Sequence, residues 1–195
     1  LLNILHLVDA CIRFAMAAVA PTKEEDTLCA LITMRWILIF GPMTLLTLDE
    51  ETGMRGNAVS DWAAAHNVQL HFKAPRQKAW LVERHNELLR QALHKTEGQL
   101  IHEGIHMCFE EVLAITVFAK NALTVIGNST PYQALFGRQP ALLPPIEEGS
   151  LGMLHDERPT LKSMSRNVQR GREIATQNII EVTARTRLDR ADRSK

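Results

Sequence analysis

Short apolar runs that alternate with longer helical patterns are the feature of this sequence that most limits its fold. The runs are rich in Leu, Ile, Val and Ala, and they lie at residues 3–8, 13–19, 44–49 and 68–72. The last run alternates strictly between apolar and polar residues from Val68 to Phe72, which is typical of a strand. Strands that alternate with helices predict an α/β sheet domain.

Helices are predicted where capping residues meet helical periodicity. The predicted ranges are about 22–39, 60–67, 79–96, 107–125, 130–137 and 161–193. Thr22 and Ser60 are the expected N-caps of the first two, and Gly41 follows the first as a stop signal. In the stretch TPYQ, Thr130 and Gln133 form a capping box, Pro131 takes the first helical position, and Gly137 ends that short helix.

The charge distribution divides the chain. Lys plus Arg equals Asp plus Glu overall, but residues 155–195 hold ten basic and six acidic residues. We therefore expect a core domain at 1–138, a Pro-rich linker at 139–160 and a basic amphipathic helical extension at 161–195. Three cysteines form no CxxC pair, which favours a reduced, intracellular setting. The apolar run at residues 28–46 has the length of a membrane span, but it carries Arg35 in its middle and favours a buried helix followed by a strand.

The stretch HEGIH at residues 102–106 fits H-E-x-x-H, a pattern in which two histidines on one helix bind zinc. A peptidase of this kind needs a continuous helix and a third ligand. Gly104 weakens such a helix by about 1 kcal/mol relative to alanine, and no recognisable third ligand follows. We interpret the match as a coincidence in a loop between two helices and keep a zinc peptidase as a minor alternative.

Two acids occupy positions that suit a metal site. Asp49 ends a predicted buried strand, and Glu83 lies near the start of the helix predicted at 79–96. If the two carboxylates converge, they would bind Mg²⁺ or Mn²⁺, because hard divalent cations prefer oxygen ligands. Spacing alone leaves open that Glu83 is an ordinary solvated acid.

Several segments resemble integrases of long-terminal-repeat retroelements, and they occur in the family's order. VERHNELLR, preceded by FKAPRQKAW, resembles the V-E-R-x-N segment. NALTVIGNSTPYQALFGRQP at 121–140 is similar to the N…S-P-x-x-L-x-G-R-x-P stretch. Upstream, LHLVDACIRFAMAAVAP resembles the paired strands with V-V-D-x-F-S, and TLLTLDEETG at 44–53 stands where the strand with the second catalytic aspartate is expected. The charged tail resembles the helical linker that follows the family's core.

This resemblance implies a ribonuclease-H-like mixed sheet flanked by helices, in a piece of a retrotransposon pol polyprotein. It implies DNA integration by two-metal phosphoryl transfer with Mg²⁺ or Mn²⁺, on DNA, in a homo-oligomer inside the nucleus. Asp49 matches the second catalytic acid and Glu83 the third, with 33 residues between them. The expected contacts to the DNA backbone are Lys73, Arg76, Lys78, Arg84 and Arg90.

The chain departs from the family pattern at the first acid. Asp9 matches a non-catalytic aspartate at the end of the family's second strand, so we interpret it as structural. The first ligand is expected on a strand before residue 1, in an N-terminally truncated core that has little or no joining activity alone. The usual D-N-G is DEETG here, so Glu50 or Glu51 could compete with Asp49. A catalytically dead, domesticated DNA-binding or assembly module is the alternative.

Overall fold

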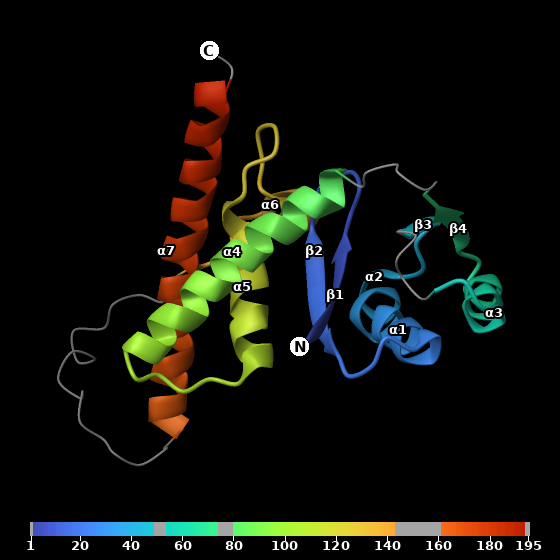
Figure 1. Cartoon of the computed structure of the whole chain (residues 1–195), viewed down its shortest axis with the longest axis horizontal. Helices are drawn as coiled ribbons and strands as arrows, with labels where there is room; N and C mark the ends of the chain where they lie inside the picture. Colours follow the sequence, from blue (N-terminus) through green and yellow to red (C-terminus); the bar gives the residue numbers. More distant parts are fainter. Residues whose placement is uncertain (1, 49–53, 74–79, 143–160, 194–195) are drawn as a thin grey trace. The chain divides into compact units, whose positions relative to one another are not determined.

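The computed structural model describes residues 2–48, 54–73, 80–142 and 161–193. The chain forms two compact units, one made of Leu1–Val8 with Ala15–Asn86 and the other of Asp9–Phe14 with Glu87–Lys195. The secondary structure is mixed, with small sheets and mostly helices (Figure 1). In the part of the chain that is described, no helix is both long and apolar enough to cross a membrane.

The first unit holds two sheets of two strands each, counting the described residues. Strand β1 (Asn3–Val8) pairs antiparallel with β2 (Ala15–Ala20), and β3 (Leu45–Leu48) pairs in parallel with β4 (Gln69–Phe72). The strand positions predicted from the apolar runs are confirmed, although β2 begins two residues later than expected. Parallel strands need a crossover, and the helix between β3 and β4 supplies it.

The helix predicted at about 22–39 is a continuous helical path of three segments. It comprises α1 (Glu25–Ile32), a π-helical turn η1 (Thr33–Ile37) and α2 (Leu38–Phe40). Gly41 ends the path with a φ of 84°, which favours glycine. The predicted cap at Thr22 is wrong, because Glu24 is the N-cap and makes no side-chain capping bond.

The crossover helix α3 (Asn57–Ala65) starts three residues before the cap predicted at Ser60. The cause is a tertiary contact, since the backbone N–H of Gly56 donates to the carboxylate of Glu25 on α1 at 2.5 Å. A carboxylate at a helix N-terminus satisfies a free donor there and interacts well with the helix dipole. The start of α3 is therefore set by a residue 31 positions earlier in the chain.

Both sheets of the first unit share one hydrophobic core under α1. Its fully buried members include Ile32 of α1, Val59 of α3, and Met54 in the segment that precedes α3. Side chains of both β1 and β3 pack against it, among them Leu5 and Leu46. The two separate strand pairs therefore belong to one packed body.

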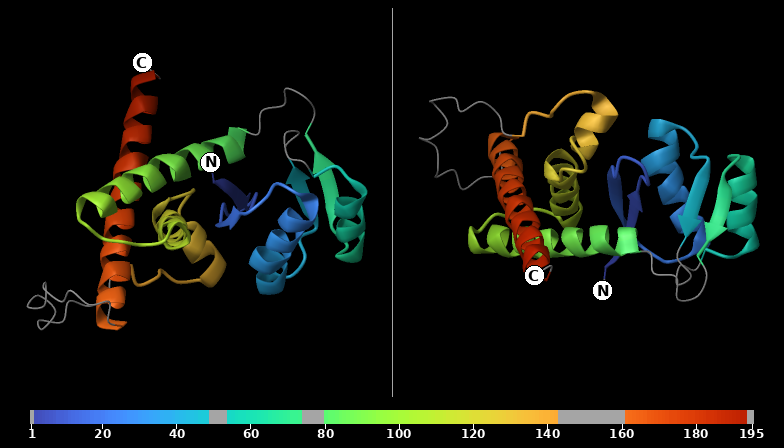
Figure 2. Two further views of the ribbon diagram at one scale, coloured as in Figure 1. Left: turned by 60° about the horizontal axis from the view of Figure 1, so that its bottom comes forward. Right: turned by 90° about the horizontal axis from the view of Figure 1, so that it is seen from above.

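The second unit is helical. Its helices are α4 (Trp80–His102, whose first seven residues belong to the first unit), α5 (Phe109–Leu123), α6 (Pro131–Phe136) and α7 (Leu161–Arg193). In both views of Figure 2, α4 crosses α7. The caps predicted for α6 are confirmed, since the Thr130 hydroxyl accepts from the backbone N–H of Gln133 and Gly137 takes a left-handed conformation. The helix predicted at 161–193 is likewise observed.

Helices α5 and α7 pack closely against each other in this unit. Ile115 and Ala119 of α5 share a buried cluster with Ala175 and Ile179 of α7. Gly171 permits the close approach, because a Cβ atom there would lie 2.8 Å from the Met107 Sδ and 2.9 Å from the Ile115 Cδ1. The expected linker at 139–160 lies mostly outside the described residues.

Candidate functional site

Strands β3 and β4 end at the same edge of their sheet. Leu48 pairs with Phe72, and the backbone N–H of Lys73 donates to the Leu48 carbonyl at 3.2 Å. Lys73 is half-buried. The predicted ligand Asp49 follows Leu48 in sequence but lies outside the described residues, as do Glu50 and Glu51.

Glu83 lies in the first turn of α4, as the sequence predicts, and its side chain is exposed. An acid in this position interacts favourably with the positive end of the helix dipole. Among the described residues, no hydrogen bond or ion pair engages the Glu83 carboxylate.

One hydrogen bond fixes the start of α4 to the first sheet, and sequence reasoning missed it. The Nδ1 of His6 on β1 lies 2.5 Å from the Oδ1 of Asn86, one helical turn beyond Glu83. The amide oxygen accepts, so this ring nitrogen is assigned the proton. Asn86 is the last residue of the V-E-R-x-N match, and His6 interrupts an apolar strand; these two signals could have suggested the pair.

The basic residues predicted to contact DNA are only partly located. Arg76 and Lys78 lie outside the described residues. Arg84 and Arg90 are exposed on α4. Arg90 pairs with Glu87 at 3.4 Å, and both side chains are more than half exposed, so that ion pair contributes little to stability. Lys73 and Arg84 belong to the same compact unit as Glu83, whereas Arg90 belongs to the other unit.

Asp9 has a structural role in the hairpin between β1 and β2. Its Oδ1 accepts from the backbone N–H of Cys11 at 2.8 Å and from that of Ile12 at 2.7 Å. The Asp9 backbone N–H donates to the Phe14 carbonyl, and Arg13 takes a φ of 63°. This is the turn chemistry for which aspartate is suited.

The HEGIH stretch forms the end of α4 and does not form a zinc-binding helix. The helix ends at His102, and Gly104 takes a φ of 68°. The backbone N–H of Ile105 donates to the Leu100 carbonyl at 2.9 Å, which is a Schellman-type helix end. Glu103 is held by two hydrogen bonds from the Arg170 guanidinium, at 2.7 and 2.8 Å. No group of three or more His, Cys, Asp or Glu side chains that could hold a metal occurs among the residues the structure describes.

A buried lysine without a partner among the described residues is an electrostatic anomaly that the sequence did not reveal. Lys120 on α5 is 1% exposed, and its Nζ makes no hydrogen bond with any described residue. Burial away from water disfavours the charged form and lowers the pKa of Lys120 to about 8. Its position within the apolar stretch VFAKNAL was the available signal.

No protein-family model matches the sequence, and no curated protein matches it. Among solved structures, the chain is similar to a chain of the cryo-EM structure of the simian T-cell lymphotropic virus intasome in complex with PP2A regulatory subunit B56 gamma. The two are 16% identical, with a TM-score of 0.58 over 76% of this chain. This chain spans 53% of that chain's length. The likeness is therefore one of fold.

Proposed function

We propose that this chain is part of an integrase-type catalytic core that transfers DNA phosphoryl groups with Mg²⁺ or Mn²⁺. The observation that carries the proposal is the fold likeness to a chain of a retroviral intasome complex over 76% of this sequence. The ordered sequence motifs support it independently, since VERHN places Glu83 at the start of α4. A fold alone does not imply an activity, so the proposal depends on the two together.

The sheets support a ribonuclease-H-like arrangement within this proposal. Within the described part of the chain, β1 pairs only with β2 and β3 only with β4, yet both pairs pack on one core. A further strand between β1 and β3 would join them into one mixed sheet of five strands. In the proposed fold this strand carries the first catalytic acid, beside the end of β3 that precedes Asp49.

In the proposed site, Asp49 and Glu83 are the carboxylates that hold the cation. The two side chains suit a hard divalent cation, because both supply carboxylate oxygens as ligands and the Glu83 carboxylate is exposed. A bound pair of divalent cations supplies activation of water or of a 3′-hydroxyl and stabilisation of charge at phosphorus. His6 and Asn86 hold the first turns of α4 against β1, and Lys73 and Arg84 offer positive charge for phosphate oxygens.

We expect Mn²⁺ binding by the purified chain to depend on these two acids. Changing Glu83→Gln or Asp49→Asn should weaken Mn²⁺ binding by about tenfold or more, because each removes a full negative charge from the site. Titration of free Mn²⁺ by electron paramagnetic resonance measures the effect. The matched control is Glu87→Gln, one turn further along α4 and also exposed, which should bind as the unchanged chain does. Equal losses in all three variants, or none, would contradict the metal site.

We also expect this chain to show little or no strand transfer on its own. A two-metal site that lacks one bridging carboxylate cannot hold both ions in the geometry that in-line displacement requires. The measurement is joining of labelled viral-type DNA ends in Mg²⁺ or Mn²⁺. Robust joining would show that Asp49 and Glu83 are wrongly matched to the family's acids. Metal-independent DNA binding together with no Mn²⁺ binding would instead favour the dead DNA-binding module.

A further inference from the structure

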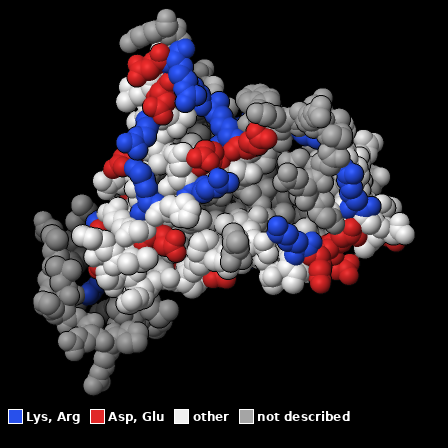
Figure 3. All heavy atoms as spheres, viewed as in Figure 1, with Lys and Arg blue, Asp and Glu red and all other residues white. Residues whose placement is uncertain are grey.

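The first turns of α4, which carry Glu83, are less deeply buried than the turns that follow. Leu81, Val82 and Asn86 are half-buried, and Glu83 is exposed. The first fully buried side chain described in α4 is Leu89, at 4% exposure. Figure 3 shows acidic side chains at the surface over these first turns. A contact that fixes this end of the helix therefore has a large influence on where the Glu83 carboxylate lies.

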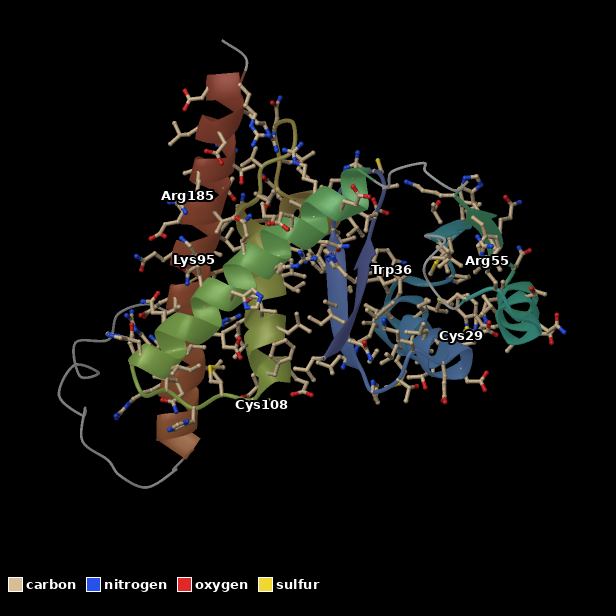
Figure 4. The ribbon with its side chains drawn as sticks, viewed as in Figure 1. Cys29, Trp36, Arg55, Lys95, Cys108 and Arg185 are labelled. Carbon is tan, nitrogen blue, oxygen red and sulfur yellow. The ribbon has the colours of Figure 1, made fainter. Side chains whose placement is uncertain are left out.

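His6 approaches this end of α4 from the face of the first sheet that is turned away from α1. Leu5 and Leu7 on β1 pack against the core on the α1 side, which contains Cys29, labelled in Figure 4. Side chains along a strand alternate between its two faces, so His6 projects from the opposite face. Its backbone is held in the hairpin, where it lies in register with Ala17 of β2. The imidazole is thus presented to α4 from a paired strand.

The contact itself is a short hydrogen bond. The Nδ1 of His6 lies 2.5 Å from the Oδ1 of Asn86, and the pair is partly buried. A hydrogen bond that is shielded from water is electrostatically stronger than one in water. Asn86 follows Glu83 by three residues, and residues three apart are neighbours on the surface of a helix. Fixing Asn86 therefore limits how far the turn that carries Glu83 can rotate or shift.

We propose that His6 is a positioning residue for the metal site, and that it acts on Glu83 through Asn86. The inference rests on the proposed function, because it assigns Glu83 to a cation. In this assignment His6 is not itself a ligand. Polar groups that orient a metal ligand commonly change metal affinity by about tenfold or more when they are removed, because a ligand must already be placed to bind well.

The test compares Mn²⁺ affinity, measured by electron paramagnetic resonance, in His6→Val, Asn86→Leu and the double variant of the full chain. Each single variant should bind Mn²⁺ about tenfold more weakly, because each removes one partner of the hydrogen bond. The double variant should bind no more weakly than the weaker single variant, since both changes break the same contact. Additive losses would show that the two residues act separately, and they overturn the inference.

Two further variants separate positioning from a general loss of stability. His6→Asn keeps an N–H donor near the place of Nδ1, so it should retain most of the Mn²⁺ affinity that His6→Val loses. Leu7→Val trims the opposite face of the same strand, which packs on the core. It should lower the unfolding temperature and leave Mn²⁺ affinity unchanged. A loss of affinity in Leu7→Val as large as that in His6→Val, or no recovery in His6→Asn, contradicts the positioning role.

Amide hydrogen exchange provides a readout that needs no metal. In EDTA, His6→Val should exchange about tenfold faster in the first turns of α4, because their tie to β1 is lost, while α5 keeps the rates of the unchanged chain. Unchanged exchange at the start of α4 would mean that the hydrogen bond does not hold this end of the helix, and it overturns the inference.

Glu83→Gln distinguishes failure of this inference from failure of the metal site. We expect His6→Val to add no further loss of Mn²⁺ affinity once Glu83 is replaced. If Glu83→Gln weakens Mn²⁺ binding and His6→Val does not, the positioning role fails and the metal site stands. If Glu83→Gln leaves Mn²⁺ binding unchanged, the metal site itself fails, and the positioning role fails with it.

Discussion

Replacing Lys120 with methionine is expected to raise the free energy of unfolding at pH 7 by about 3 kcal/mol, since each unit of pKa shift corresponds to about 1.4 kcal/mol. The side chain is 1% exposed, and burial lowers its pKa from 10.5 to about 8. At pH 7 the folded protein therefore holds a charge that burial disfavours. Methionine has a similar length and flexibility without the charge, so the site can accept it.

The pH dependence separates this cause from a general gain in packing. Below pH 8, Lys120 is protonated in both the folded and the unfolded chain, and the cost of burying its charge is fully present. Between pH 8 and about 10.5 the unfolded chain binds more protons, so the stability of the unchanged protein rises with pH. The advantage of Lys120→Met should therefore be largest at pH 7 and small near pH 10.5.

Urea denaturation of both proteins at pH 7 and pH 10 measures this difference. The control is Lys95→Met, which removes an exposed lysine that pairs with Glu181. That change should be neutral or cost up to about 1 kcal/mol, as is usual for exposed ion pairs. A gain from Lys120→Met that does not change with pH, or a loss of stability at pH 7, would contradict a buried charged amine.

Replacing Gly171 with leucine is expected to lower the free energy of unfolding by about 2 kcal/mol, in the range found for overpacked cores. A Cβ atom there would come within 2.9 Å of Ile115 and closer still to Met107. Those side chains would have to move, and α7 would shift away from α5. Thermal and urea unfolding measure the loss.

Gly98 provides the matched control on another helix. A Cβ atom at Gly98 would meet nothing within 4 Å. Leucine favours helix over glycine by up to about 1 kcal/mol, so Gly98→Leu should be neutral or stabilising. If Gly171→Leu behaves in the same way, the close packing of α5 on α7 is wrong.

Local signals predicted most of the elements because the contacts that decide them are local. The strands followed from apolar alternation, and α6 followed from Thr130, Pro131 and Gly137, all within eight residues. The start of α3 could not be predicted, since the carboxylate that fixes it comes from Glu25. The end of α4 was placed near residue 96, before Gly98, whereas burial of Leu100 keeps the helix regular to His102.

The candidate site was predictable in part for the same reason. Glu83 was placed at the start of a helix from sequence, and the structure confirms that placement. The contact between His6 and Asn86 joins residues 80 positions apart, and no local pattern reports it. The pairing of Asp49 with Glu83 on a cation stays a prediction. The burial of Lys120 depends on which elements pack around α5, and the sequence of α5 alone does not contain that information.

The far end of α7 has a consequence for how tightly any ligand can be held there. From Arg187 to Arg193 every residue of the helix is exposed, so these last two turns bury little surface against the described part of the chain. Short unsupported helical turns are only marginally stable in water, and they fray. A ligand that binds Arg190 or Arg193 must order these turns, and part of its interaction free energy is spent on that ordering. Measured affinity will then understate the strength of the individual contacts, and stiffening this end will raise affinity without changing any of those contacts.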